Sequence, residues 1–243
     1  MNTFTHDGVT LLHGDCMEYM AGLEDGAYSL AVVDPPYGIG FDGEVDSMVT
    51  SNTSGKWKGA RGKAYKHKEW DKEPPPREYF SRLLRASRSQ VIWGGNYFEL
   101  PPSGGWIVWD KIKPPDFSLS QAELAWVSHS GRVAIFRYLW HGFQKAEPID
   151  RIHPTQKPVA LYRWLLQNYA KPGQTILDTH LGSGSSAIAA WEMGYTFTGI
   201  EIDKDYFDAA VERISKRLLS PYLPGIAGNE GKGQVEQVKL FCD

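Results

Sequence analysis

The chain has 243 residues, and 42 % of them belong to the hydrophobic set AVILMFWYC, a content typical of a folded globular protein. Its two cysteines exclude a disulfide scaffold and a four-cysteine zinc site, and they favour a reducing compartment, so we expect a cytoplasmic location. The net charge of −3 excludes a protein that coats nucleic acid by bulk charge, and the sequence predicts no signal peptide and no membrane helix.

The first part of the sequence predicts two strands that each end at an acidic residue. Residues 9–13 form a short apolar run that stops at Gly14-Asp15, and residues 16–23 repeat apolar side chains at helical spacing. Tyr28 to Val33 is an apolar run without alternation, which is typical of a parallel strand covered on both faces. The sequence Asp34-Pro35-Pro36-Tyr37 that follows is therefore expected at the carboxyl end of a strand.

Residues 38–76 show no sustained period and are too long for an ordinary connection, which indicates a functional loop. The segment is strongly basic on an otherwise acidic chain, and this favours a local polyanion site. The alternative is a solvated loop without a partner. The residues that we expect to contact nucleic-acid phosphates are Lys56, Lys58, Arg61, Lys63, Lys66 and Lys68.

The middle of the chain is predicted to be rich in strands. A helix is expected over residues 77–88, followed by strands over residues 90–93 and 106–109. Two more strands are expected over residues 123–127 and 132–137. The short polar connection between these last two predicts that they pair as a hairpin.

The last part of the chain alternates helices and strands. Helices are predicted over residues 158–169, 185–192 and 205–219, the last one capped by Asp203, and strands over residues 175–177 and 195–200. With the similar alternation near the N-terminus, this order predicts a doubly wound α/β sheet that is mostly parallel. Residues 220–234 are expected to be loose, and residues 235–241 could add an edge strand.

A glycine-rich sequence follows the strand that ends at Asp178. Gly182, Gly184 and Ala187 have the spacing of a nucleotide-binding loop, and Glu201 stands about 20 positions further on, where an acidic residue binds ribose hydroxyls. This pattern predicts a cofactor that contains a nucleoside, although a tight turn can also require glycine for steric reasons alone. Too few residues follow Glu201 for a dinucleotide-binding sheet, which disfavours a dehydrogenase.

The sequence Asp34-Pro35-Pro36-Tyr37 predicts a site for an aromatic amine. Two prolines remove backbone donors, so the Asp34 carboxylate and the Pro35 carbonyl are left as acceptors for the two hydrogens of an amino group. Tyr37 offers a stacking face for a flat base. The alternative is a plain turn in which Asp34 caps a backbone amide.

Three motifs in this order resemble the β-class of S-adenosylmethionine-dependent DNA amino-methyltransferases, in particular the compact enzymes of bacteria and phages. They are Asp34 to Tyr37, the sequence His153-Pro154-Thr155-Gln156-Lys157-Pro158, and Leu177-Asp178 with Gly182-Ser183-Gly184-Ser185. The resemblance covers about residues 8–219. It implies a Rossmann-like sheet of the class I methyltransferase type with a circularly permuted motif order, and S-adenosyl-L-methionine as the cofactor.

The resemblance also implies roles for individual residues. Asp15 would meet the adenine of the cofactor and Glu201 its ribose, while Thr155 to Lys157 and Ser183 would lie near its methionine end. The full implied cofactor set is Asp15, Cys16, Thr155, Gln156, Lys157, Asp178, Gly182, Ser183, Gly184, Ser185, Glu201 and Ile202, and the implied catalytic set is Asp34, Pro35, Pro36 and Tyr37. Thr179-His180 stands where the family usually has Pro-Phe, and the role of His180 is left open.

The implied organisation is a single catalytic domain over residues 1–219. Within it, residues 38–76 are the expected DNA-contacting loop, residues 110–151 a small target-recognition region and residues 153–219 the cofactor-binding half, and residues 220–243 form a tail. The segment for sequence recognition is short, which implies a short recognition site.

The function that follows is site-specific methylation of double-stranded DNA at adenine N6, on a nucleotide flipped out of the helix. Methylation at cytosine C5 is excluded, because neither Cys16 nor Cys242 follows a proline in a site-like context. Three alternatives stay open: cytosine-N4 methylation, methylation of an amino group in RNA or protein, and a nucleotide sensor or DNA-binding protein without turnover. The sequence leaves open a homodimer, a companion restriction endonuclease and a role in restriction-modification.

Overall fold

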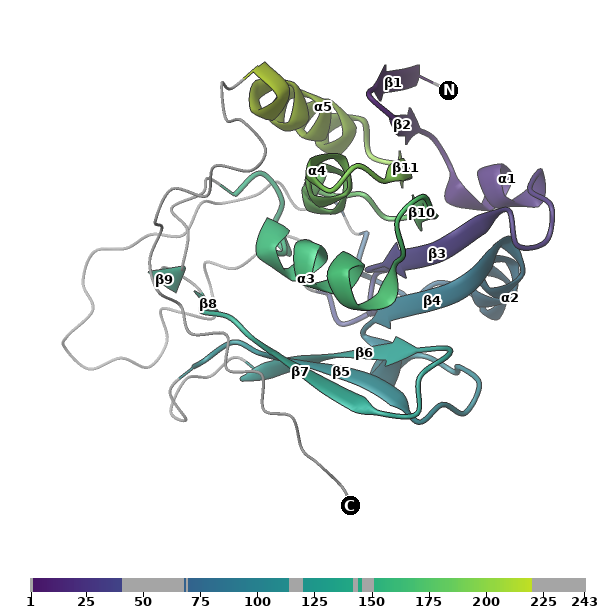
Figure 1. Ribbon diagram of the computed structural model, residues 1–243, viewed down its shortest axis with the longest axis vertical. Helices are drawn as coiled ribbons and strands as arrows, with labels where there is room; N and C mark the ends of the chain where they lie inside the picture. Colours follow the sequence, from purple (N-terminus) through teal and green to yellow (C-terminus); the bar gives the residue numbers. More distant parts are fainter. Residues whose placement is uncertain are drawn as a thin grey trace.

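The computed structural model describes residues 2–40, 68, 70–113, 120–141, 144–145 and 151–219, which form a nine-stranded sheet flanked by helices (Figure 1). Across the sheet the strands are β1 (Asn2–His6), β2 (Val9–His13), β11 (Thr196–Glu201), β10 (Thr175–Asp178), β3 (Tyr28–Val33), β4 (Ser87–Trp93), β6 (Ala122–Val127), β5 (Gly105–Asp110) and β7 (Val133–Arg137). A separate pair consists of β8 (Trp140–His141) and β9 (Gln144–Lys145).

The strand directions decide which residues meet at the functional edge of the sheet. Strands β2, β11, β10, β3 and β4 run parallel, whereas β6 runs antiparallel to both β4 and β5. The amino end of β6 therefore lies at the same edge as the carboxyl ends of the parallel strands. Ligands bind at that edge in open α/β sheets.

Helices cover both faces of the parallel part of the sheet. In Figure 1, α1 (Cys16–Ala21) and α2 (Arg77–Ala86) lie on one face, and α3 (Val159–Tyr169), α4 (Ser185–Glu192) and α5 (Lys204–Leu219) lie on the other. Successive residues of β3 alternate between the two apolar cores, since Leu30 and Val32 pack with the second group of helices and Ala31 and Val33 with the first. This arrangement confirms the predicted doubly wound, mostly parallel sheet, and it explains why β3 is apolar without alternation.

Most predicted elements lie where the sequence placed them. The strand over residues 28–33 and the helix over residues 185–192 have the predicted bounds. Asp203 caps α5 as predicted, because its Oδ1 accepts hydrogen bonds from the backbone N–H groups of Asp205 (2.9 Å) and Tyr206 (3.1 Å).

The ends of two predicted helices were placed too far along the chain. Helix α1 ends at Ala21, with Gly22 as its C-cap. Helix α2 ends at Ala86, and β4 begins directly at Ser87 instead of Gln90. Periodicity cannot locate such a boundary, since Ser87 is buried at the start of β4 and its hydroxyl still donates a hydrogen bond to the Leu83 carbonyl in the last turn of α2.

The predicted hairpin between residues 123–127 and 132–137 is wrong. Strand β5 lies between the two strands and pairs with β6 in antiparallel and with β7 in parallel fashion. The turn chemistry of the connection is compatible with a hairpin, but Trp106 to Asp110 of β5 find partners on both sides, and this non-local pairing prevails.

Strand β1 was not predicted. It pairs antiparallel with β2 through a tight turn at Asp7-Gly8, where both residues have positive φ (42° and 81°). An Asp-Gly pair between two extended segments is a recognised hairpin signal, so the sequence held the necessary information.

Several expectations fall on residues outside the described ranges. They include five of the six expected phosphate-contacting residues, all but Lys68, and the tail with its edge strand over residues 235–241. Within the described ranges, no helix is long and apolar enough to cross a membrane.

Candidate active site

Four acidic residues lie at the carboxyl edge of the parallel strands. Asp15 follows β2, Asp34 follows β3, Asp178 ends β10 and Glu201 ends β11. Each strand is mostly buried and apolar in the part before this edge, and an acidic side chain stands at its end or shortly after it. The fold thus gathers carboxylates that are distant in sequence.

The glycine loop after β10 is held by Asp178. Its two carboxylate oxygens accept hydrogen bonds from the Ser186 hydroxyl (2.6 Å) and the His180 backbone N–H (3.0 Å), and burial raises its pKa to about 7. Gly182 and Gly184 have φ values of +52° and +73°, which lie in the left-handed region that favours glycine. Asp178 therefore shapes the loop from inside.

Glu201 joins this loop to the neighbouring strand. Its Oε2 accepts a hydrogen bond from the Gly182 N–H (2.8 Å) and its Oε1 one from the Asp203 N–H (2.9 Å), and burial raises its pKa to about 6. A carboxylate has about four lone-pair sites, so these two bonds leave acceptor capacity for a ligand.

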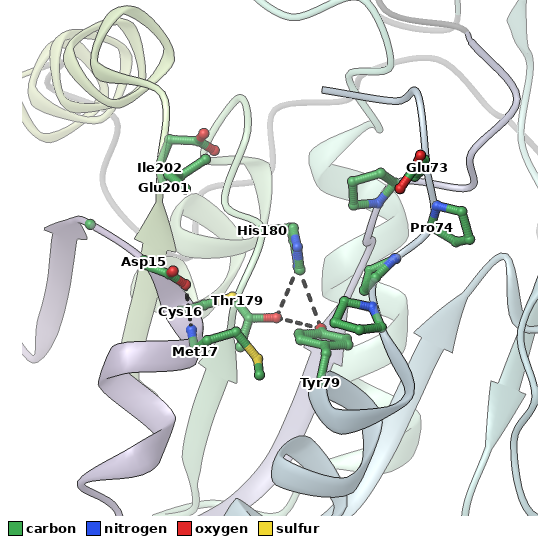
Figure 2. A pocket seen from close by; sticks show the side chains of 14 residues that line it. Asp15, Cys16, Met17, Glu73, Pro74, Tyr79, Thr179, His180, Glu201 and Ile202 are labelled. Atoms are coloured by element: carbon green, nitrogen blue, oxygen red, sulfur yellow. Dashed lines mark hydrogen bonds between the residues drawn. The ribbon is translucent and has the colours of Figure 1, made fainter. Parts of the chain in front are cut away.

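A cavity of about 310 Å³ lies beside Glu201 (Figure 2). Of the residues predicted from the sequence, Asp15, Cys16, Glu201 and Ile202 line it from the cofactor set, and Pro36 lines it from the catalytic set. The remaining lining residues are Gly14, Met17, Glu73, Pro74, Pro75, Pro76, Tyr79, Thr179 and His180. Three acidic residues, Asp15, Glu73 and Glu201, on an otherwise largely apolar wall fit a nucleoside, because ribose hydroxyls need acceptors and a base needs apolar contact.

Three polar residues on the cavity wall were not assigned a role from the sequence. The Tyr79 hydroxyl and the Thr179 hydroxyl are 2.6 Å apart, and the Thr179 hydroxyl is 3.0 Å from Nδ1 of His180 (Figure 2). Burial lowers the pKa of His180 to about 4, so its imidazole is neutral at neutral pH. Tyr79 lies on the helix that follows the long loop, and no local motif marks it.

The other residues of the predicted cofactor set do not line this cavity. Gln156 is buried, its side-chain carbonyl accepts a hydrogen bond from the Ile152 N–H (2.9 Å), and its backbone carbonyl accepts one from the Trp140 indole (2.9 Å). The Ser185 hydroxyl donates to the Lys157 carbonyl (2.8 Å). The segment with Thr155, Gln156 and Lys157 is thus tied to the glycine loop with Ser183 and Ser185.

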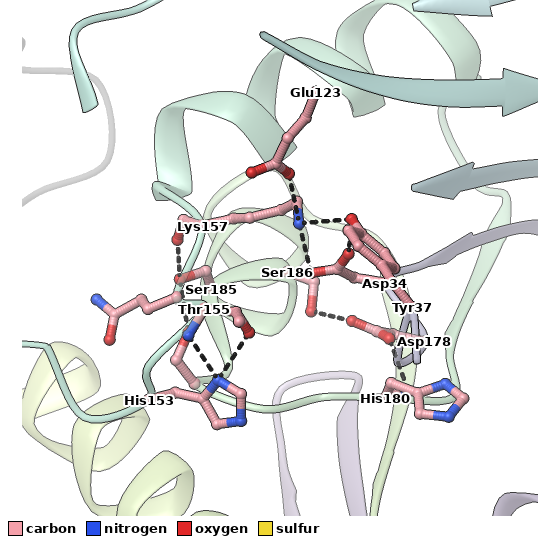
Figure 3. A network of polar contacts seen from close by, with 12 residues as sticks. Asp34, Tyr37, Glu123, His153, Thr155, Lys157, Asp178, His180, Ser185 and Ser186 are labelled. Atoms are coloured by element: carbon pink, nitrogen blue, oxygen red, sulfur yellow. Dashed lines mark hydrogen bonds and ion pairs between the residues drawn. The ribbon is translucent and has the colours of Figure 1, made fainter. Parts of the chain in front are cut away.

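Asp34 is the centre of a second group of polar residues (Figure 3). Its Oδ1 accepts a hydrogen bond from the Tyr37 hydroxyl (2.8 Å), and its Oδ2 lies 2.5 Å from Nζ of Lys157. The same Nζ lies 3.0 Å from Oε2 of Glu123, whose other oxygen pairs with Lys111. Glu123 and Lys111 were missed by sequence reasoning, because only the antiparallel direction of β6 brings Glu123 to this edge.

The Tyr37 ring is oriented by its surroundings. Asp71 accepts hydrogen bonds from the backbone N–H groups of Tyr37 (2.7 Å) and Gly38 (2.9 Å), and the Tyr37 ring stacks on Tyr97 with centroids 5.0 Å apart. A Cβ on Gly94 would lie 2.2 Å from the Tyr37 ring, so only glycine fits there. Tyr97 is 50 % exposed, which makes it an accessible aromatic surface beside Asp34.

Lys68, the described member of the expected phosphate-contacting set, is engaged within the protein. Its Nζ lies 2.6 Å from Asp203 and 2.7 Å from Asp205, and it stands over the Tyr206 ring. Burial lowers the pKa of Lys68, but hydrogen bonds with the two aspartates outweigh it and raise the pKa above its usual value. The structure therefore places Lys68 against the start of α5, next to Glu201.

The environment of Cys16 bears on the chemistry of the site. Burial and the neighbouring Asp15 raise the pKa of its thiol to about 12. The thiol is therefore protonated at neutral pH, which agrees with the exclusion of a cysteine nucleophile.

Comparison with known proteins gives consistent matches. Residues 106–212 match the N6/N4 methyltransferase family model, which is described as a DNA methylase. The YubD protein of Escherichia coli strain K12 is 25 % identical over 215 residues, covering 84 % of this chain and 89 % of that protein. The type II methyltransferase M2.MboI of Moraxella bovis is 23 % identical over 267 residues, covering 93 % of each chain.

Among solved structures, the complex of M1.HpyAVI with SAM is similar to this chain, with a TM-score of 0.52 at 20 % identity. The match covers 84 % of this chain and 99 % of that one, and it supports the Rossmann-like fold predicted from the resemblance. The motifs, the fold and these matches make the chain similar to the N6/N4 family of DNA methylases, and among the similar solved structures is one that contains SAM.

Proposed function

We propose that this chain methylates the exocyclic N6 of adenine in double-stranded DNA, on a nucleotide flipped out of the helix. The observation that carries the proposal is that Pro36 lines the cavity, so a cofactor bound there would lie close to the acceptors of Asp34 and Pro35. An amino group held by these acceptors would face the cavity. Asp34 begins the motif, whereas the cytosine members of the family more often begin it with serine, and this favours adenine.

The chemistry needs an oriented amine and an acceptor for its proton. When bound, S-adenosylmethionine supplies an electrophilic methyl group on a sulfonium centre. The Asp34 carboxylate and the Pro35 carbonyl accept the two amino hydrogens, which directs the nitrogen lone pair away from them and toward the cavity. Asp34 then takes the proton that the amine loses. Positioning is the main catalytic contribution, and no covalent enzyme intermediate is needed.

Asp15 and Glu201 would hold the cofactor from the opposite side of the cavity. Their carboxylates accept hydrogen bonds from the nucleoside hydroxyls and the adenine, while Met17 and Ile202 supply apolar contact. His180, neutral at neutral pH, would add a polar edge without a charge that repels the sulfonium.

Double-stranded DNA is the proposed partner, with a basic loop over residues 38–76 around the flipped nucleotide and residues 110–151 as the reader of sequence. The expected place of action is the cytoplasm. Homodimer formation and a companion restriction endonuclease stay predictions from the resemblance.

The direct test is to incubate the purified chain with double-stranded DNA and S-adenosylmethionine, digest the product to nucleosides and analyse them by mass spectrometry. We expect N6-methyladenine; N4-methylcytosine would replace the adenine proposal with its cytosine alternative. The Asp34→Ala variant should bind the cofactor normally in calorimetry and produce no methylated base. Asp25→Ala, which changes an exposed aspartate that pairs with Arg85, is the control. Near-normal turnover by Asp34→Ala would overturn the proposed mechanism.

A further inference from the structure

Both oxygens of the proposed amine acceptor already hold donors from the protein. Oδ1 of Asp34 takes the Tyr37 hydroxyl, and Oδ2 takes the Lys157 ammonium at 2.5 Å. An ammonium N–H and an aromatic amino N–H are donors to the same acceptor atom. Each oxygen keeps a second lone pair, but the buried Lys157 ammonium at 2.5 Å competes with an incoming amino group for Oδ2.

Lys157 has a second carboxylate within reach. Its side chain is only 4 % exposed, and its Nζ lies between Asp34 Oδ2 and Glu123 Oε2, which is 3.0 Å away. The Glu123 Oε2 atom is buried, and no well-aligned hydrogen bond reaches it from the residues that the structure describes. Figure 3 shows the Lys157 nitrogen between the two carboxylates, so a small rotation about the last bonds of the lysine side chain is enough to bring it closer to Glu123.

We propose that Lys157 is a positioning residue with two alternative partners: it holds the Asp34 carboxylate until the target amine arrives, and it then moves onto Glu123. This inference rests on the proposed function, since it assumes that the amine binds at Asp34. Lys111, on the other oxygen of Glu123, keeps that carboxylate in place for the exchange.

The exchange keeps buried charges paired at each stage. A buried carboxylate that loses its cation is strongly destabilised, and a neutral amine cannot replace the charge of an ammonium. With Lys157 on Glu123, the ammonium still lies close enough to Asp34 to favour its ionised form. Ionised Asp34 is the form that can accept both an amino hydrogen and the departing proton.

The charges around Asp34 give the direction of the pH dependence. The ionisable groups that influence it are Lys157, Glu123, Tyr37, Asp178, Tyr79 and Tyr162. Burial raises the pKa of Asp34 and Lys157 opposes this rise, so removal of the ammonium must raise the pKa further. Burial also raises the pKa of Glu123, but Lys157 and Lys111 outweigh it and lower it to about 2, so Glu123 stays ionised throughout.

The experiment compares Lys157→Met, Glu123→Gln and their double variant with an active wild-type enzyme, over a range of pH. In Lys157→Met the acid limb of kcat should move to higher pH by about 1–3 units, the usual effect of losing a nearby opposite charge. In Glu123→Gln the lysine keeps Asp34 occupied, so KM for DNA should rise by about tenfold while cofactor affinity is unchanged. Lys111→Met is the matched control, since it removes a buried cation from Glu123 without touching Asp34, and its acid limb should stay in place.

The double variant keeps the inference testable if Lys157→Met alone does not fold. Lys157→Met alone leaves two buried carboxylates close together, whereas the double variant removes the charge of one of them. At high pH, where Asp34 is ionised without help, the double variant should have a lower KM for DNA than Glu123→Gln, because no ammonium competes with the amine. Equal and pH-independent losses in all variants, or a wild-type pH profile in Lys157→Met, would overturn the inference.

The two proposals fail in different ways. A wild-type enzyme that methylates no amino group in DNA contradicts the proposed function, and the inference on Lys157 fails with it. An active wild-type enzyme whose variants keep its KM and its pH profile contradicts only the inference on Lys157.

Discussion

The two halves of the sheet bring their functional residues to the same edge by different means. In the cofactor half, Asp178 and Glu201 end parallel strands and are held mainly by backbone N–H groups of the loops that follow β10 and β11. In the target half, Asp34 is held by side chains: by Tyr37 three residues away, by the distant Lys157 and, through the lysine, by Glu123. A site built on backbone donors is rigid, whereas one built on long side chains can exchange partners. This difference suits a half that binds one cofactor and a half that must admit a base.

The largest expected effect comes from a substitution in the target half, Gly94→Ala. Gly94→Ala places a methyl group where the Tyr37 ring lies and forces alanine into a left-handed conformation (φ +68°). We expect a loss of stability of about 1–2 kcal/mol from the backbone alone, with more from the clash, and a large loss of kcat because Tyr37 no longer supports Asp34. Cofactor binding should change little.

The matched control is Gly194→Ala, whose φ of +72° is similar but whose added Cβ has nothing within 4 Å. Thermal unfolding and steady-state kinetics of both variants separate the backbone cost from the clash. If the two variants lost the same activity, the packing of Gly94 against Tyr37 would be irrelevant to catalysis.

The corresponding change in the cofactor half is Glu201→Ala. The loss of hydrogen bonds from the cofactor to a carboxylate should cost on the order of 2–3 kcal/mol in cofactor affinity, or roughly 30- to 150-fold in Kd, with little effect on DNA affinity. Calorimetry with S-adenosylmethionine measures this. Unchanged binding would place the cofactor elsewhere.

The pH dependence of cofactor binding is a second test of the contact between Glu201 and the cofactor. Because burial raises the pKa of Glu201 to about 6, the carboxylate is ionised and a full acceptor above that pH. Cofactor affinity should therefore fall as the pH is lowered through about 6. Glu201→Gln, which carries no titratable group, should bind weakly and show no such fall. A pH-dependent Glu201→Gln would assign the titration to another group.

The smallest expected effect concerns the basic loop. Replacing Lys56, Lys58, Lys63 and Lys66 by alanine should flatten the slope of log DNA affinity against log salt by about two units or more, since each neutralised phosphate contributes about −0.9. All DNA sequences should be weakened alike. Lys68→Ala is the control, because Lys68 already pairs with Asp203 and Asp205 and should leave the slope unchanged. An unchanged slope in the fourfold variant would assign phosphate binding to residues 110–151.

Local sequence patterns were sufficient to predict the position of a residue wherever that position depends mainly on the residue's own strand or turn. The unalternating run of β3 predicted a strand covered on both faces, and Asp203 was recognised as the cap of α5 from its position alone. The same holds for Asp15, Asp34 and Glu201, since a polar residue at the end of a buried parallel strand must emerge at the carboxyl edge. The sequence by itself thus determined the layered fold and the carboxylates of the site.

Only the tertiary structure decided which residues complete that site. The wrong hairpin shows why: the connection after Val127 has the chemistry of a turn, but pairing with β5 depends on contacts that no local pattern records. Because β6 is antiparallel to β4, Glu123 lies at the edge of the sheet that carries the candidate site, and it lies within reach of Lys157. Strand direction and long-range pairing arise from the burial of whole strands against each other, and they cannot be read from the short spacings that define helices, turns and motifs.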